Sequence, residues 1–303
     1  MSSTAFLFPG QGAQTVGMCR DLYNDLPAAR SLFDRAEVEL GFDLAEICFN
    51  GPEEKLNATD ISQPALYVCS MAAVESLKAS EPDVVEGVQY AAGLSLGEYS
   101  AIAFAGGIRF EDGLKLVRKR GQAMQAASDT TPSGMVSILG LDSDQVQLIC
   151  DAAREEGEIM QMANFLCPGN IAVSGHKASC DVVLDISEEM GAMKSVPLTV
   201  AGAFHTEIMR SAVDQLKEAL EQVEIQPLRI PVYTNVDAKP HTDPEEIRAL
   251  LLEQVCSPVL WQASMQAMLD EGVEQFYEVG PGRVLRSLLK RLARKTPCVG
   301  TLA

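Results

Sequence analysis

The apolar positions along the chain follow two periods, one typical of strands and one typical of helices. Short apolar runs at residues 5–8 and 88–92 are predicted to be buried strands, because glycine-containing turns follow both. Longer segments carry apolar residues every three or four positions, and we expect helices there. These segments are 63–78, 97–105, 110–127, 206–223 and 244–256. Because strands and helices alternate, the pattern predicts an α/β protein with a largely parallel sheet.

Residues 134–198 show a separate order within this α/β pattern. We expect strands at 135–139, 159–163, 171–174 and 194–198, and helices at 143–156 and 178–190. The resulting order, β-α-β-β-α-β, is the ferredoxin-like one. We therefore predict that residues 131–198 form a small ferredoxin-like domain, inserted into a large α/β domain of residues 1–130 and 199–303.

Composition and charge narrow the range of functions. Of the 303 residues, 47% are hydrophobic and 22% are charged, which is typical of a globular protein with a substantial core. The 42 acidic residues outnumber the 24 basic ones and give a net charge of −18, so we expect no nucleic acid partner. The first residues lack a basic stretch followed by a long apolar run, and no segment has the roughly 20 apolar residues that span a bilayer. We therefore expect a cytoplasmic protein without membrane contact.

The eight cysteines are scattered and include no CxxC pair. This spacing favours free buried thiols in a reducing compartment over a disulfide framework or a zinc site. The sequence also lacks a cluster of metal ligands and a dinucleotide-binding fingerprint, so we expect no metal and no cofactor. For the oligomeric state, a monomer is the default expectation.

The strongest candidate for chemistry is a GxSxG motif at residues 93–97, GLSLG. In this motif two glycines allow a sharp turn from strand to helix, and the serine stands exposed at the turn. The apolar run before the motif and the helix-forming run after it supply this setting, which makes Ser95 a candidate nucleophile. The alternative is a glycine-rich helix start in which Ser95 is only a capping residue.

A serine nucleophile needs a neighbouring base, and the chain has three histidines. His176 lies in a polar turn and His241 lies in a proline-punctuated loop, so both are expected to be solvated loop residues. His205 comes just before an amphipathic helix, where the chain returns to the large domain. His205 is therefore the candidate base, against the alternative of a half-buried structural histidine.

Two further groups fit an acyl-transfer site. An oxyanion needs backbone N–H donors, and Leu96, directly after the nucleophile, offers one at a helix N-terminus. The turn of residues 9–12 offers a second through the amide of Gln11, unless it is a plain tight turn. Arg120 borders the apolar face of its predicted helix, and its guanidinium suits a carboxylate. Sequence spacing alone favours the alternative that Arg120 is an exposed helix charge.

Seven motifs along the chain agree with one another in order and type. They are FLFPGQGAQTVGM at 6–18, GLSLGEYSA at 93–101, RGQAMQ at 120–125, ANFLCPGNIAVSG at 163–175, AGAFHTEIM at 201–209, YTNVDA at 233–238 and EVGPGRVL at 278–285. With these motifs, the chain resembles the malonyl-CoA:acyl-carrier-protein transacylases of fatty acid synthesis over essentially its whole length. The resemblance implies an α/β-hydrolase-like large domain with a ferredoxin-like insertion.

The resemblance also implies a ping-pong reaction and roles for the candidate residues. Malonyl would move from malonyl-CoA to Ser95 and then to the pantetheine thiol of acyl carrier protein, with His205 relaying the proton. Arg120 would hold the malonyl carboxylate. The amides of Gln11 and Leu96 would hold the oxyanion.

Three more positions are assigned by the resemblance alone. Gln254 matches the position whose backbone carbonyl orients the histidine, so the site would be a Ser-His dyad without an aspartate. Asn164 matches a position near the acyl pocket, and Phe204 matches the pattern of malonyl-specific members. Leu94 departs from the family, in which histidine commonly precedes the nucleophile. We interpret this departure as a change in pocket polarity and acyl preference, not as loss of the mechanism.

Two other functions compete with acyl transfer at this stage. A serine hydrolase on a related fold would give the acyl group to water, and Arg120 argues against it. A catalytically silent scaffold would only bind acyl carrier protein, and the intact set of Ser95, His205 and Arg120 argues against that. The resemblance leaves open whether the product serves fatty acid or polyketide synthesis.

The negative charge is unevenly distributed along the chain. After Glu278 the sequence has basic residues but no acidic one. A basic helix on an acidic protein attracts an acidic partner, so we expect this segment to contribute to docking of acyl carrier protein. The predicted contributors are Arg283, Arg286, Lys290 and Arg294. The alternative is that these cations simply stabilise a helix C-terminus.

Overall fold

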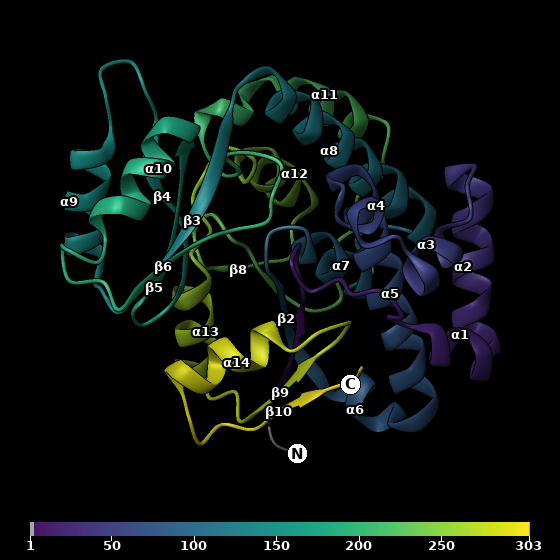
Figure 1. Cartoon of the computed structure of the whole chain (residues 1–303). Helices are drawn as coiled ribbons and strands as arrows, with labels where there is room; N and C mark the ends of the chain where they lie inside the picture. Colours follow the sequence, from purple (N-terminus) through teal and green to yellow (C-terminus); the bar gives the residue numbers. More distant parts are fainter. Residues whose placement is uncertain (1–2, 303) are drawn as a thin grey trace.

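Two β-sheets organise the chain, and helices pack against both (Figure 1). The computed structural model describes residues 3–302. Strands of the first sheet come from both ends of the sequence, whereas strands of the second come from one continuous middle segment. The predicted α/β class is confirmed.

The first sheet has six strands in the order β10-β9-β1-β2-β7-β8. They are β1 (Thr4–Phe8), β2 (Val88–Gly93), β7 (Val232–Tyr233), β8 (Pro240–His241), β9 (Gln275–Glu278) and β10 (Cys298–Gly300). Neighbouring strands pair in parallel, except that β7 and β8 pair antiparallel. All residues of the central strand β1 are buried. Its continuous apolar run is what a parallel strand covered on both faces requires.

Helices cover both faces of the first sheet. Phe6 and Phe8 of β1 join the main core with α5 (Thr59–Ser80), α7 (Gly97–Phe104) and α8 (Phe110–Thr130). Ala5 and Leu7 point to the opposite face and join a smaller core with α13 (Trp261–Asp270) and α14 (Val284–Leu292). The remaining helices around this sheet are α1 (Arg20–Asp25), α2 (Pro27–Leu40), α3 (Leu44–Asn50), α4 (Glu53–Asn57), α6 (Pro82–Gly87), α11 (Arg210–Glu221) and α12 (Pro244–Glu253).

The second sheet is antiparallel, and its strand order is β4-β5-β3-β6. Its strands are β3 (Ser133–Leu139), β4 (Met160–Cys167), β5 (Asn170–His176) and β6 (Lys194–Pro197). The helices α9 (Ser143–Ala153) and α10 (Lys177–Ile186) pack on it and share a third apolar core with its strands. The predicted sequence of elements, β-α-β-β-α-β, is therefore present, and it forms the teal part of Figure 1.

The two sheets meet where β4 lies beside the segment that precedes α13. The amide of Phe165 donates to the carbonyl of Val259 at 2.9 Å, and the amide of Val259 donates to the carbonyl of Ala163 at 2.8 Å. This backbone pairing places β4 next to the residues that follow α12. The candidate site lies along this junction, as the contacts below show.

Element ends differ from the sequence-based prediction in several places. The segment predicted as one helix at 206–223 begins with a 3-10 helix, Glu207–Met209, before α11. The strand predicted at 159–163 continues to Cys167 as β4. The prediction missed β7 to β10, because strands of two to four residues are too short to show a period.

Candidate active site

Ser95 stands in a tight turn between β2 and α7. Its φ is 51°, a left-handed conformation that a sharp turn imposes on serine. A Cβ on Gly97 would overlap the carbonyl oxygen of Phe8, and a Cβ on Gly93 would overlap the backbone of Gly97. Gly97 is therefore needed for the close approach of the turn to β1, and Gly93 is needed for the tightness of the turn itself. The N-cap residue of α7 is Leu96, and hydrogen bonds join Ser95 Oγ to His205 and Arg120, so the alternative of a capping serine is wrong.

His205 is the histidine that the fold brings to Ser95. Its Nε2 lies 2.9 Å from Ser95 Oγ, and its Nδ1 lies 2.8 Å from the backbone carbonyl oxygen of Gln254. Because a carbonyl oxygen only accepts, Nδ1 carries the hydrogen and Nε2 accepts from the Ser95 hydroxyl. This tautomer is the one that a general base needs.

The environment of His205 keeps its imidazole neutral. The side chain is buried, and the buried positive charge of Arg120 lies nearby. Burial and then Arg120 lower the pKa of His205 to about 4. At neutral pH the ring is therefore free to accept a proton from Ser95.

Arg120 reaches the same hydroxyl from α8. Its side chain is 1% exposed, so the alternative of a solvated helix charge is wrong. The guanidinium donates to Ser95 Oγ and to Gln254 Oε1 at 3.0 Å each, and to Gln63 Oε1 at 2.9 Å. It also lies 5.5 Å from the centre of the Tyr99 ring. All these partners are neutral, so the buried cation beside Ser95 has no anion in direct contact among the described residues.

Gln254 connects three parts of the site. Its backbone carbonyl orients His205, as the resemblance implied. Its side chain adds contacts that the sequence did not predict: Nε2 donates to the backbone oxygen of Ser95 at 3.1 Å, and Oε1 accepts from Arg120. Ser95, His205 and Arg120 are therefore all held by one glutamine.

Asn235 and Glu98 complete the support of the turn, and sequence reasoning missed both. Asn235 Oδ1 accepts from the amide of Ser95 at 2.6 Å, and its Nδ2 donates to the carbonyl of Gly93 at 2.7 Å. Glu98 Oε2 accepts from the amide of Asn235 at 2.8 Å and from Gln254 Nε2 at 3.0 Å. Asn235 belongs to the motif YTNVDA and Glu98 to the motif GLSLGEYSA. Their place in these motifs was the sequence signal that could have identified them.

The turn of residues 9–12 lies against the nucleophile turn. A Cβ on Gly10 would overlap the carbonyl oxygen of Leu94, and the amide of Leu94 donates to the carbonyl of Phe8 at 3.0 Å. Within the described residues, the amides of Gln11 and Leu96 have no hydrogen-bond acceptor. Both amides are therefore free to donate to another group, and the two segments that carry them are in contact.

Within the described residues, neither Asn164 nor Phe204 forms a hydrogen bond with the Ser95 hydroxyl. Asn164 sits on β4 at the junction of the sheets, and its Oδ1 is buried without a partner among residues 3–302. Gln161, on the same strand, donates to the backbone oxygen of His205 at 3.3 Å. Phe204 packs its ring into the main core, and its carbonyl accepts from Ser174 Oγ at 2.8 Å.

The other two histidines are not simple solvated residues, so that expectation is wrong. His176 ends β5, and its Nδ1 accepts from the amide of Ile159 at 2.8 Å. His241 lies in β8 between the carboxylates of Asp237 and Glu246, which raise its pKa despite partial burial. Neither histidine contacts Ser95.

The basic C-terminal segment is not uniformly available to a partner. Arg283, Lys290 and Arg294 are exposed along and beside α14. Arg286 instead lies 3.7 Å from the buried carboxylate of Glu278. Its charge is therefore compensated within the chain.

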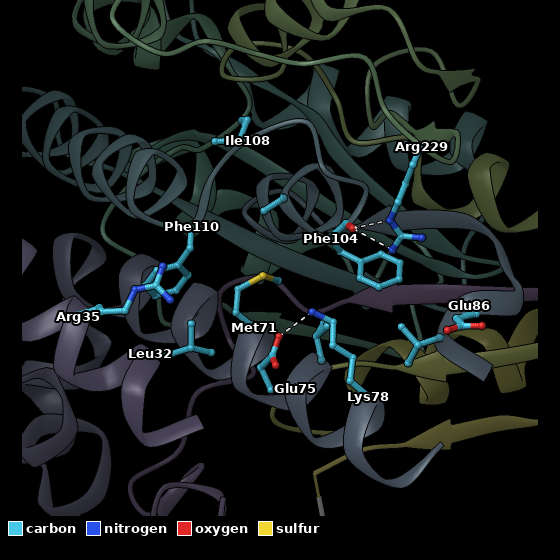
Figure 2. A pocket seen from close by; sticks show the side chains of 13 residues that line it. Leu32, Arg35, Met71, Glu75, Lys78, Glu86, Phe104, Ile108, Phe110 and Arg229 are labelled. Carbon is cyan, nitrogen blue, oxygen red and sulfur yellow. Dashed lines mark hydrogen bonds and ion pairs between the residues drawn. The ribbon is translucent and has the colours of Figure 1, made fainter. Parts of the chain in front are cut away.

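A separate cavity of about 410 Å³ lies between α2, α5, α7 and α8 (Figure 2). Of its cations, Arg35 and Lys78 each form an ion pair with a glutamate. Arg229 donates to the carbonyl oxygen of Phe104 through Nε at 3.2 Å and Nη2 at 3.0 Å. The residues that line this cavity include no member of the Ser95 site.

Other potential sites are absent from the described part of the chain. All eight cysteines are free. Residues 3–302 contain no group of three or more metal-ligating side chains placed to hold an ion. None of the helices that the structure describes is long and apolar enough to cross a membrane.

Comparisons with known proteins agree with the geometry. The acyl transferase domain family matches residues 5–299. A malonyl CoA-acyl carrier protein transacylase of Bacillus subtilis is 41% identical over 297 residues, which cover 97% of this chain and 92% of the relative.

Solved structures extend the similarity to the fold. An acyl-carrier-protein S-malonyltransferase of Bartonella henselae matches with a TM-score of 0.95 and 35% identity, over 99% of this chain and 96% of that one. A malonyl-transacylase solved in complex with a type II PKS acyl-carrier protein matches with a TM-score of 0.94 and 36% identity, over 99% and 96% of the two chains. The chain therefore belongs to the acyl transferase domain family and, within it, to the malonyl-CoA:acyl-carrier-protein transacylases.

Proposed function

We propose that the protein transfers malonyl from malonyl-CoA to the pantetheine thiol of acyl carrier protein through a malonyl-serine intermediate. One observation carries this proposal. The Ser95 hydroxyl lies 2.9 Å from a neutral histidine and 3.0 Å from a buried guanidinium. A nucleophile, a base and a carboxylate-binding group thus converge on one oxygen.

In the first half of the reaction, His205 Nε2 takes the proton of Ser95 Oγ as this oxygen attacks the thioester carbonyl. The amides of Gln11 and Leu96 donate to the oxyanion of the tetrahedral intermediate. The carbon–sulfur bond then breaks, His205 returns the proton to the CoA sulfur, and malonyl-serine remains. In the second half, the pantetheine thiol gives its proton to His205 and attacks the ester carbonyl. The bond between Ser95 Oγ and the malonyl carbonyl carbon then breaks, and His205 gives the proton to Ser95 Oγ.

Arg120 binds the malonyl carboxylate in this scheme. The guanidinium of Arg120 donates to neutral acceptors, among them Gln63 Oε1 and Gln254 Oε1. The malonyl carboxylate is an anion and therefore a stronger hydrogen-bond acceptor than these groups. Acetyl lacks this carboxylate and gains nothing from the guanidinium. Asn164 and Phe204 shape the acyl pocket at the junction of the two sheets. Leu94 makes this pocket less polar than in family members that have histidine before the nucleophile.

The proposal includes a division of the chain into two domains. The large domain, residues 1–130 and 199–303, is α/β-hydrolase-like and carries the nucleophile turn. Residues 131–198 form a ferredoxin-like insertion. Their strand order supports this interpretation, as do the two helices, α9 and α10, that connect strands of the sheet. The free cysteines support a protein of the reducing cytoplasm, and a monomer stays the default expectation.

Acyl carrier protein docks on the basic segment of α14. The exposed cations Arg283, Lys290 and Arg294 support this assignment, and the ion pair of Arg286 with Glu278 makes Arg286 a weaker contributor. A relative of the same fold binds an acyl-carrier protein in its solved complex. The product serves fatty acid synthesis in this proposal.

Mass spectrometry of the intact protein tests the transfer. After mixing with malonyl-CoA, we expect a malonyl adduct on the parent protein and none on Ser95→Ala. Addition of acyl carrier protein should remove the adduct and malonylate the carrier. Release of free malonate at the same rate with and without carrier would favour a hydrolase, and a parent protein without adduct would favour a scaffold.

A further inference from the structure

The site contains a buried carboxylate that the proposed transfer does not use. Glu98 lies in the first turn of α7, three residues after Ser95, and is 0% exposed. Its Oε2 accepts two hydrogen bonds, from the amide of Asn235 and from Gln254 Nε2. Its Oε1 is buried without a partner among residues 3–302. A buried carboxylate oxygen without donors is the natural place for a proton.

A single side chain connects Glu98 to the carboxylate-binding cation. The Gln254 amide accepts from Arg120 Nη2 through Oε1 and donates to Glu98 Oε2 through Nε2, at 3.0 Å on each side. Glu98 and Arg120 therefore share one buried environment without a direct ion pair. When Glu98 is ionised, the two charges cancel.

A malonyl carboxylate bound to Arg120 would upset this balance. It would leave the buried cluster with one cation and two anions, and an uncompensated buried charge is costly. A proton on Glu98 Oε1 removes the excess charge. Because the proton enters at the free oxygen, Oε2 continues to accept from Asn235 and Gln254.

The groups around Glu98 set the pH at which this happens. Burial raises the pKa of Glu98 to about 7, against the opposing effects of its hydrogen bonds and of Arg120. The negative charge of Asp237 also raises it. Tyr99 and His205 lie in the same cluster, and both are neutral at pH 7 because burial raises the pKa of Tyr99 and lowers that of His205. Because Arg120 lowers the pKa of Glu98, cancelling the field of Arg120 would raise this pKa further.

We infer that Glu98 is a positioning residue that takes up a proton when malonyl, but not acetyl, occupies the site. The inference rests on the proposed malonyl transfer. Uptake lowers the free-energy cost of burying the malonyl carboxylate, so Glu98 supports the choice of a charged acyl group. It acts through Gln254 and Arg120 and has no contact with the reacting oxygen.

Single-turnover acylation in weak buffer with a pH indicator measures this uptake. Excess protein is mixed with malonyl-CoA or acetyl-CoA at pH 7.5, and intact mass gives the adduct in each sample. Both reactions release the same thiol, so they differ only in the acyl group. We expect about half a proton taken up per malonyl adduct and close to none per acetyl adduct.

Glu98→Gln is the decisive variant. Its amide oxygen still accepts from Asn235 and Gln254 but cannot titrate, so uptake at pH 7.5 should disappear. The KM for malonyl-CoA should rise as the pH increases above about 7 in the parent protein and stay flat in the variant. Glu86→Gln, which changes an exposed carboxylate outside the site, is the matched control and should behave like the parent.

The outcomes separate the inference from the proposed function. A malonyl adduct without proton uptake, or uptake that persists in Glu98→Gln, overturns the inference and leaves malonyl transfer intact. Absence of any adduct on the parent overturns both. If Glu98→Gln does not fold, the parent alone still decides: uptake by Glu98 occurs at pH 7 and above, whereas uptake confined to pH 4–5 would belong to His205 and contradict the inference.

Discussion

At the residue scale, Arg120 places a buried positive charge beside Ser95 and His205, the proposed nucleophile and base. It donates to Ser95 Oγ at 3.0 Å, and its charge contributes to the low pKa of His205. The same guanidinium that would select the substrate therefore also keeps the base neutral. Burial makes both effects strong, because water does not screen the charge.

Replacing Arg120 by alanine should change acyl selectivity. We expect kcat/KM for malonyl-CoA to fall roughly 100-fold, because the malonyl carboxylate loses its buried partner. Transfer of acetyl, which has no carboxylate, should fall by much less. Parallel kinetics with both thioesters measure the ratio, with Lys119→Ala on the same helix as the control. An unchanged malonyl-to-acetyl ratio would remove Arg120 from the pocket.

The pH dependence of acylation should report the environment of His205. The base must be neutral, so kcat/KM for acetyl-CoA should fall as the pH drops through about 4, the pKa of the buried imidazole. Arg120→Gln removes the nearby positive charge and should move this limb to higher pH. Acetyl-CoA is the suitable substrate because it lacks the carboxylate that Arg120 would bind. Identical acid limbs in both proteins would contradict the electrostatic link.

At the scale of secondary structure elements, the site depends on how closely β1, β2 and α7 approach. Gly93 and Gly97 have no room for a side chain, because neighbouring backbone atoms occupy the Cβ positions. Asn235, which is distant in the sequence, stabilises the turn by hydrogen bonds with the backbone of Gly93 and Ser95. The left-handed backbone of Ser95 is held by this combination of packing and hydrogen bonding.

Gly97→Ala should destabilise the fold and misplace the nucleophile. The added methyl group would overlap the carbonyl oxygen of Phe8, so we expect a loss of about 3 kcal/mol in the free energy of unfolding. Gly134→Ala is the matched control, because its Cβ would lie 3.9 Å from the nearest atom, Cys180 Sγ. Urea denaturation of both variants gives the comparison. Equal midpoints would show that the turn can relax at little cost.

At the scale of the whole molecule, a net charge of −18 contrasts with a basic C-terminal helix. Such a distribution repels an acidic partner from most directions and attracts it to one region, over the roughly 8–10 Å that electrostatic forces reach in physiological salt. The location of the charge therefore matters more than its total. Lys290 and Arg294 are exposed and suited to this role, whereas Arg286 is engaged by Glu278.

Charge reversal at Lys290 and Arg294 should weaken docking of acyl carrier protein. We expect Lys290→Glu with Arg294→Glu to raise the KM for acyl carrier protein roughly tenfold at low salt, with little change for malonyl-CoA. The difference should shrink at high salt. Lys217→Glu, an exposed cation on α11, controls for the change in net charge. Equal KM values for the carrier would mean that these cations only stabilise the end of α14.

The sequence identified some residues of the candidate site and not others. Ser95 and His205 could be chosen from a motif and from the small number of histidines, and the structure brings them within hydrogen-bond distance. Burial of Arg120 could not be decided from helical phase, because Arg120 lies at the border of the apolar face. Asn235 and the side chain of Gln254 were missed, since their contacts with Ser95 join residues 140 and 159 positions apart.

The sequence by itself determined the α/β class, the order of elements in the middle segment and the turn that presents Ser95. These features depend on local periods and on glycines at short spacing, which are visible along the chain. Only the tertiary structure decided the protonation of His205, the burial of Arg120 and the shared environment of Glu98. Those properties depend on desolvation and on charges brought together from distant segments, and no local pattern records them.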